Sequence, residues 1–170
     1  GIGWFLPVYP FLRWPTVNEV NGKGMVEWNG SLYIPLAEDL LRFSNDGSVL
    51  QVGLRTGEEL PSDVQGTIYA LQPTNYFLLA SVQSSDPDGY GSLWAYNEQG
   101  WHGLGLLPQN VAGGCIYLDT TVNPGYIFWG GDYGVLARGK YPSNVINPIR
   151  DRGDKLFARH GWIEQDRFYG

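Results

Sequence analysis

Residues 25–52 read MVEWNGSLYIPLAEDLLRFSNDGSVLQV, in which four short apolar runs alternate with tight turns. Asn29-Gly30 is the strongest two-residue signal for a β-hairpin, because both residue types tolerate the positive φ that such a turn needs. Asn45-Asp46-Gly47 marks a further turn, since these residue types favour turn conformations. The stretch therefore predicts four short antiparallel strands joined by hairpins.

The same pattern returns twice further along the chain. Short apolar runs with turn residues between them fill residues 67–104 and then residues 115–137. The second strands of the three units are expected to begin near Leu32, Tyr76 and Tyr126, which are 44 and 50 residues apart. Four strands in about 40–50 residues are typical of a β-propeller blade, which cannot bury both of its faces alone and therefore stacks against neighbours.

The sequence thus predicts an all-β fold of antiparallel four-stranded blade repeats, propeller-like, with about three blades. The units are expected at residues 22–62, 63–110 and 111–140, within a repeat region over residues 1–140. Three blades do not normally close a propeller, because about four to eight are typical. The ring is therefore expected to be incomplete in this chain or to be completed by a partner.

The two ends of the chain are predicted to connect the repeat region to the rest of its assembly. The sequence GWFLP at residues 3–7 resembles GWHGL at residues 100–104, which opens the fourth strand of the second unit. Residues 1–7 are therefore a candidate closing strand. Residues 141–170 break the repeat and are predicted to form an exit segment or arm toward a further domain or subunit, with a single edge strand or a frayed tail as the alternative.

Composition narrows the classes of protein and of partner. Of the 170 residues, 24 are Gly and 11 are Pro, 15 % are aromatic and 16 % are charged. These values argue against a helical bundle, which needs more helix-forming residues, and against a disordered chain, which holds fewer aromatics. The net charge of −6 argues against a nucleic-acid partner. No membrane partner is expected, because the chain lacks a run of about eighteen apolar residues.

Five side chains are the candidate ligand-binding residues: Trp28, Tyr90, Trp101, Asp86 and Asp88. Aromatic rings at a rim would stack on the apolar faces of sugar rings, and carboxylates in the same loops would bond sugar hydroxyls. The alternative is that the aromatic residues pack between blades. That alternative is favoured for Trp94 and Trp129, which lie inside apolar runs.

No catalytic residue, cofactor or resident metal is predicted. The weak metal candidate is a calcium site at Asp86-Pro87-Asp88-Gly89, because two carboxylates precede a glycine as they do in calcium loops. The ligand register is incomplete, so a turn whose carboxylates bond its own backbone is the favoured alternative. Cys115, the one cysteine, excludes an internal disulfide, and its place at the head of an apolar run predicts a buried thiol.

Three stretches carry a resemblance to a known family. They are MVEWNGSLYIPL at 25–36, LWAYN with GWH between 93 and 102, and the exit from YPSN at 141–144 to GWIE at 161–164. Together they resemble the β-propeller-like repeat region of structural and tail proteins of environmental tailed bacteriophages. The resemblance implies a virion component whose partners are other virion subunits or copies of itself, with a host-surface glycan as a further contact. It carries over no catalytic residues.

Two other functions stay open at this point. One is a lectin-like, carbohydrate-binding β-propeller that is not viral and is extracellular. The other is a glycoside-active propeller enzyme, because residues 44–47, SNDG, resemble the start of the sialidase Asp-box. That motif continues with a Gly and an aromatic residue where this chain has Ser48-Val49-Leu50, and residues 1–149 hold only four Arg for a sialidase-like site.

Overall fold

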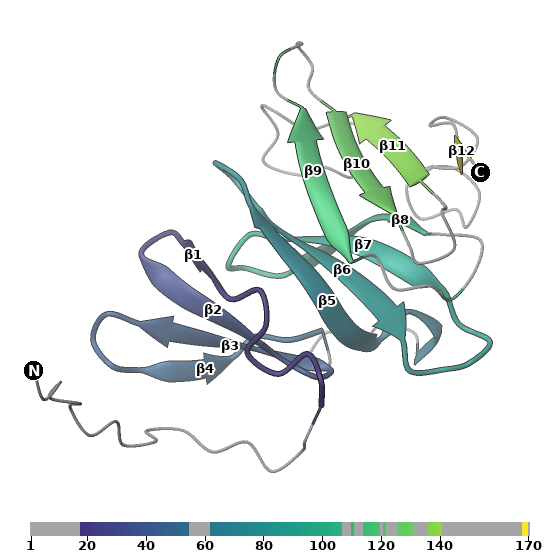
Figure 1. The fold of residues 1–170 in the computed structure, drawn as a ribbon. Helices are drawn as coiled ribbons and strands as arrows, with labels where there is room; N and C mark the ends of the chain where they lie inside the picture. Colours follow the sequence, from purple (N-terminus) through teal and green to yellow (C-terminus); the bar gives the residue numbers. More distant parts are fainter. Residues whose placement is uncertain are drawn as a thin grey trace, which may run out of the picture.

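Three antiparallel β-sheets follow one another along the chain in the computed structural model (Figure 1). The structure describes residues 18–54, 62–106, 110, 114–119, 121, 126–130, 136–140 and 168–169. Over these residues there is no α-helix, and one 3-10 turn, η1 (Ser62–Val64), precedes the second sheet. The all-β, repeat-like architecture predicted from the sequence is therefore confirmed.

Each sheet is a meander in which neighbouring strands are hydrogen-bonded. The first sheet contains, in spatial order, β1 (Val26–Trp28), β2 (Ser31–Leu36), β3 (Asp39–Ser44) and β4 (Val49–Gln51). The second contains β5 (Gly66–Pro73), β6 (Leu78–Ser84), β7 (Gly91–Tyr96) and β8 (Trp101–Leu106). The third has the order β12 (Phe168–Tyr169), β11 (Leu136–Lys140), β10 (Tyr126–Gly130) and β9 (Cys115–Asp119).

The hairpin between β1 and β2 forms where the sequence predicts it. Trp28 pairs with Ser31, which leaves a two-residue loop, and its residues Asn29 and Gly30 have φ of 47° and 70°. Positive φ at both loop positions is the geometry that matches the right-handed twist of the flanking strands. Local turn chemistry therefore sets the register of the first two strands.

The chain leaving β4 is tied back to the start of β3. The Asp39 carboxylate accepts hydrogen bonds from the backbone N–H of Leu40 at 2.8 Å and of Gly53 at 3.1 Å. A Cβ at Gly53 would come within 2.2 Å of Asp39 Oδ1 and 2.8 Å of Leu40 N. Glycine is therefore required at position 53, because the backbone approaches too closely for a side chain.

The sheets pack face to face, and their first strands are neighbours: β5 contacts β1 on one side and β9 on the other. Figure 1 shows β5 running between the first and third sheets. One core fills the space between the first and second sheets and includes Trp28, Tyr33, Leu40, Ile68, Leu78, Val82 and Trp94. A second core fills the space between the second and third sheets and includes Phe77, Leu79, Leu93, Leu104, Ile127 and Trp129.

The core positions expected for two tryptophans are confirmed, since Trp94 and Trp129 are both buried. The second sheet is apolar on both faces, because it lies between the other two. All six residues of β7 are buried for this reason. Sequence reasoning was wrong about Cys115, which is exposed. It heads β9 on the face of the third sheet that points away from the second sheet, opposite the face that bears Ile116.

The fourth strand of the third sheet comes from the C-terminal segment. β12 pairs with β11 through Leu136↔Tyr169 and Ala137↔Phe168. Part of the predicted exit segment 141–170 is therefore an edge strand, and its remaining residues lie outside the described part. Residues 1–7, the candidate closing strand, also lie outside the described residues.

Candidate functional site

Two of the predicted ligand-binding aromatics, Trp28 and Trp101, lie between the first and second sheets. Their side chains are only 5 % and 7 % exposed. The Trp28 indole N–H donates to the backbone carbonyl of Thr74 at 2.8 Å, and the Trp101 indole N–H donates to that of Val52 at 2.7 Å. Both bonds cross from one sheet to the other, so each indole connects two sheets as well as filling the space between them.

Four aromatic side chains form a continuous seam along this junction. The ring centroids are 5.7 Å apart for Trp28 and Tyr33, 6.1 Å for Tyr33 and Tyr96, and 5.0 Å for Tyr96 and Trp101. Rings at these separations and tilts gain energy beyond the area they bury. We call Trp28, Tyr33, Tyr96 and Trp101 the aromatic seam.

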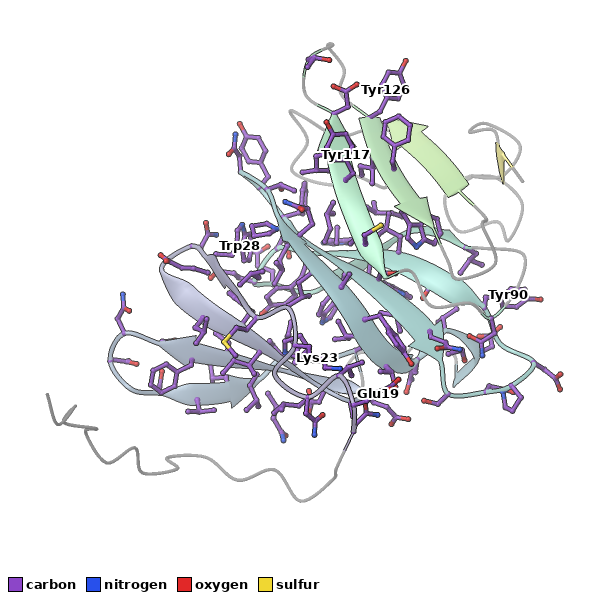
Figure 2. All side chains as sticks on the ribbon, viewed as in Figure 1. Glu19, Lys23, Trp28, Tyr90, Tyr117 and Tyr126 are labelled. Carbon is purple, nitrogen blue, oxygen red and sulfur yellow. The ribbon has the colours of Figure 1, made fainter. Side chains whose placement is uncertain are left out.

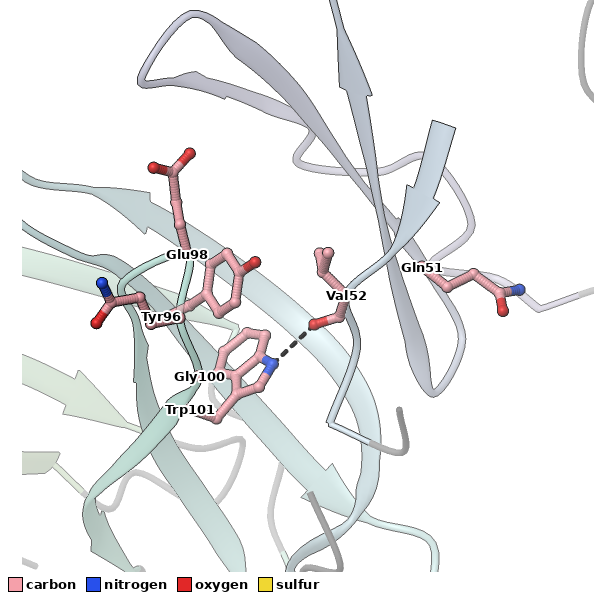
Figure 3. A pocket seen from close by; sticks show the side chains of 7 residues that line it. Gln51, Val52, Tyr96, Glu98, Gly100 and Trp101 are labelled. Atoms are coloured by element: carbon pink, nitrogen blue, oxygen red, sulfur yellow. Dashed lines mark hydrogen bonds between the residues drawn. The ribbon is translucent and has the colours of Figure 1, made fainter. Parts of the chain in front are cut away.

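A small pocket of about 150 Å³ opens beside the end of the seam. Figure 3 shows the rings of Tyr96 and Trp101 on one side of it and Val52, from the end of the first sheet, on the other. Its lining also includes Gln51, Glu98, Gln99 and Gly100. Glu98 is the one carboxylate in this lining, so the pocket lacks the paired carboxylates that glycoside hydrolysis requires.

An ion pair also joins the first sheet to the second sheet beside the aromatic seam. The Arg42 guanidinium lies 3.1 Å from the Glu98 carboxylate, and Arg42 Nε donates to Ser31 Oγ at 3.1 Å. Burial raises the pKa of the Tyr33 hydroxyl to about 12; nearby Tyr96 and Glu98 act in the same direction, and the positive charge of Arg42 opposes the shift. Tyr33 is therefore a neutral core residue at physiological pH.

The loop that holds Asp86, Asp88 and Tyr90 lies apart from the seam. Figure 2 shows Tyr90 at the opposite end of the second sheet from Trp28, so the five predicted residues do not form one site. Asp86 Oδ1 accepts a hydrogen bond from the Asp88 N–H at 3.0 Å, and the Asp86 N–H donates to Ser84 Oγ at 3.1 Å. This is the geometry of an Asx turn, in which a carboxylate bonds its own backbone.

The same loop is tied to Asn110, which lies between β8 and β9 along the chain. The Asn110 side-chain amide donates to the backbone carbonyls of Ser84 at 2.9 Å and Asp86 at 2.8 Å. Backbone bonds therefore account for the shape of the loop. No group of three or more His, Cys, Asp or Glu side chains that could hold a metal ion occurs among the described residues.

Among the described residues, a cluster of exposed and partly exposed aromatic side chains lies elsewhere, on the third sheet. Tyr117 of β9 is 62 % exposed, and its neighbours Tyr126 and Phe128 of β10 are partly exposed. Phe128 pairs directly with Tyr117 across the strands, and its ring centroid lies 6.2 Å from that of Tyr117 and 6.5 Å from that of Tyr126. Figure 2 shows Tyr117 and Tyr126 together at the outer end of the third sheet. We call Tyr117, Tyr126 and Phe128 the aromatic face.

A polar turn borders the aromatic face. Asp119 pairs with Tyr126, and its carboxylate accepts hydrogen bonds from the Thr121 N–H at 2.9 Å and the Thr121 hydroxyl at 2.6 Å. These bonds lower the pKa of the Asp119 carboxyl below its ordinary value, so the group is ionised at neutral pH. The aromatic face thus combines apolar ring surface with a fixed negative charge.

None of the three residues of the aromatic face was among the predicted ligand-binding residues, which were two tryptophans and three residues of the loop at 86–90. The signal that could have found the aromatic face is alternation along the two strands of the third unit. Ile116 and Ile127 point into the core, and Tyr117 and Phe128, which follow them, point the other way. The face of the third sheet that points away from the second sheet therefore carries aromatic side chains, where a solvent-facing sheet would carry polar ones.

Comparison with known proteins adds no assignment: no family model, curated protein or solved structure matches the chain. Within the described ranges, no helix is long and apolar enough to cross a membrane.

Proposed function

We propose that the chain is a non-enzymatic structural module of a phage virion or tail, propeller-like in construction, that works through protein–protein contact. The observation that carries this proposal is the aromatic face, which places exposed and partly exposed rings on the outer face of the third described sheet. Repeat proteins that end in solvent carry terminal repeats with a polar outer face. An exposed aromatic sheet face of this kind marks an interaction surface.

The packing of the sheets supports the propeller-like part of the proposal. In a propeller the first strands of successive blades lie side by side around the axis, and β1, β5 and β9 follow one another in this way. The described residues form three sheets, and about four to eight blades close a propeller ring. In this proposal, contact with other virion subunits or further copies of this chain completes the ring.

The assignment to a virion rests on the resemblance of residues 25–36, 93–102 and 141–164 to phage tail proteins. Its test is the composition of the particle itself. Antibodies raised against the purified chain should label the tail in electron micrographs of a phage whose genome encodes it. Mass spectrometry of gradient-purified particles should recover peptides of the chain, and their absence would refute the proposal.

A second candidate function is contact with a host-surface glycan through the aromatic face. The specific observation is the exposed Tyr117 ring beside ionised Asp119, since aromatic rings stack on sugars and carboxylates bond their hydroxyls. A glycan array decides it: binding by the wild-type chain that is lost in Tyr117→Ala supports glycan contact. An array without signal for the wild-type chain removes both this function and the non-viral lectin alternative.

A further inference from the structure

The fourth strand of the first sheet, β4, presents an exposed sheet edge. The sheet runs in the order β1-β2-β3-β4, and no described strand pairs with β4 on the side away from β3. All three residues of β4 are exposed, Val49 at 41 % and Leu50 at 52 %. β8 holds the corresponding position in the second sheet, and its residues are buried or partly buried. Figure 1 shows β4 along the outer edge of the first sheet.

Hydrogen bonds at both ends of β4 show how its backbone is turned. The Val52 N–H donates to the Leu40 carbonyl at 2.8 Å, and the Ser48 carbonyl accepts from the Ser44 N–H at 2.9 Å. Both of these bonds point toward β3. Backbone groups alternate in direction along an antiparallel strand, so Leu50, midway between Ser48 and Val52, also bonds toward β3.

The backbone groups of Val49 and Gln51 therefore point the other way, toward the exposed edge. Their two N–H and two C=O groups have no hydrogen-bond partner among the described residues. Natural edge strands are protected from pairing by charged side chains or proline, and the sequence Val-Leu-Gln of β4 contains neither. The edge thus offers four hydrogen-bonding groups to another extended strand.

We propose that β4 of one copy pairs with β4 of a second copy, antiparallel and centred on Leu50, so that two first sheets join into one. The outward-pointing groups decide this register. Pairing about Leu50 places Val49 of each copy opposite Gln51 of the other. Both are hydrogen-bonded pairs, so all four outward-pointing groups of each copy gain a partner. A shift in either direction leaves some of these groups without a partner in β4.

The side chains and charges of β4 suit the same register. Successive side chains of a strand alternate between its faces, so Leu50 lies opposite in face to Val49 and Gln51. The two Leu50 side chains of the pair meet across the twofold axis and cover each other. Asp46 precedes β4, and hydrogen bonds from Ser48 lower the pKa of its carboxyl. The two Asp46 carboxylates lie at opposite ends of the joined strands, so like charges are not placed opposite each other.

The proposed contact is isologous, because the same strand serves both copies, and it therefore closes as a dimer. This inference rests on the proposed function, since it names the partner and the surface of one protein–protein contact of the module. The surface belongs to the first sheet, whereas the aromatic face belongs to the third. A strand of three residues gives a small contact, so the association is weak and is best measured by trapping it covalently.

The experiment uses cross-linking of cysteine variants of the full chain, in a Cys115→Ser background. Leu50→Cys places two thiols at a non-hydrogen-bonded pair about 4.5 Å apart at Cα, which a disulfide can bridge. Gln51→Cys places them on a diagonal about 7–8 Å apart, beyond that reach. Tyr76→Cys is the control for random collision, because Tyr76 is 53 % exposed in the turn between β5 and β6.

We expect mild oxidation to give disulfide-linked dimers of Leu50→Cys about tenfold or more faster than of Gln51→Cys or Tyr76→Cys, because the contact holds only the first pair of thiols at bonding distance. Non-reducing gel electrophoresis measures the rates. Each rate is divided by the rate at which a small thiol reagent modifies the same variant. This division removes differences in the reactivity of the individual thiols.

A second substitution, added to Leu50→Cys, tests whether backbone pairing holds the two copies together. Gln51→Pro removes an outward-pointing N–H and keeps the bonds to β3, so the fold should survive and cross-linking should fall to the Tyr76→Cys rate. Gln51→Val is the matched control, because it changes the same side chain and keeps the N–H. It should cross-link as fast as Leu50→Cys alone, and circular dichroism should show the same fold for both double variants.

Two outcomes overturn the inference. One is cross-linking of Leu50→Cys that is no faster than that of Tyr76→Cys, and the other is cross-linking of Gln51→Cys that equals or exceeds that of Leu50→Cys. Unchanged cross-linking after Gln51→Pro would likewise show that strand pairing is not the contact. None of these results decides the proposed function, which the particle-labelling experiment tests, so the two failures are distinguishable.

Discussion

Replacing Trp101 by Phe would remove one hydrogen bond from the aromatic seam and keep an aromatic ring in place. The bond joins Trp101 Nε1 to the Val52 carbonyl at 2.7 Å, and the side chain is 7 % exposed. Losing a buried bond of this kind costs about 1–3 kcal/mol, since the carbonyl left behind loses its partner. The smaller ring adds a packing loss, so we expect Trp101→Phe to lower the free energy of unfolding by about 1.5–3 kcal/mol.

Urea unfolding followed by circular dichroism measures this effect. With a slope of about 1–3 kcal/mol per molar urea, the midpoint of the Trp101→Phe variant should fall by roughly 0.5–3 M. Trp101→Ala should cost more, about 3–5 kcal/mol, because it removes the whole ring. Tyr76→Phe is the control, since Tyr76 is exposed and its change should stay within about 0.5 kcal/mol.

The outcome also separates the two interpretations of Trp101. If the indole is a link between sheets, Trp101→Phe loses stability and leaves any sugar binding unchanged. If Trp101 is a rim residue for ligand contact, the variant keeps the stability of the wild type. A loss below about 0.5 kcal/mol would refute the argument from the buried hydrogen bond.

Three further predictions follow from single positions. Gly53→Ala should lower the melting temperature, because the new Cβ would lie 2.2 Å from Asp39 Oδ1. We expect the free energy of unfolding to fall by about 1–3 kcal/mol. An unchanged melting curve would contradict the close approach. The pKa of Tyr33 is about 12 in the folded chain against an ordinary 10.0, so the folded state holds its proton longer than the unfolded state. Its contribution to stability is therefore complete below pH 10 and is lost between pH 10 and 12, and Tyr33→Phe should flatten this decline in pH-dependent urea unfolding. Glu98 has a φ of 69°, which strains every residue except glycine. Glu98→Gly and Glu98→Ala both remove the ion pair with Arg42, so urea unfolding should find the glycine variant about 1 kcal/mol more stable. Equal stability of the two variants would count against this strain.

The sequence predicted the features that local chemistry controls. Asn29-Gly30 forms its hairpin because the preference for positive φ belongs to the two residues themselves. Trp94 and Trp129 are buried because each lies in an apolar run long enough to have no polar face. The division of the chain into repeated sheets follows from the same short-range signals.

Contacts between distant residues were not predictable in this way. Trp28 bonds a carbonyl at Thr74 and Trp101 bonds one at Val52, and no local pattern specifies which of many carbonyls an indole will reach. Cys115 was expected in the core because it heads an apolar run, but its exposure depends on which face of the third sheet meets the second. The orientation of a sheet relative to its neighbour is a tertiary property.

The position of Cys115 has a practical consequence. It lies two residues before Tyr117 on β9, so its thiol is on the same side of the third sheet as the aromatic face. It is also the one cysteine in the chain, and it is exposed. The rate at which a thiol reagent modifies the unaltered protein therefore reports whether that surface is covered, and a single fluorophore can be attached there without engineering a new site.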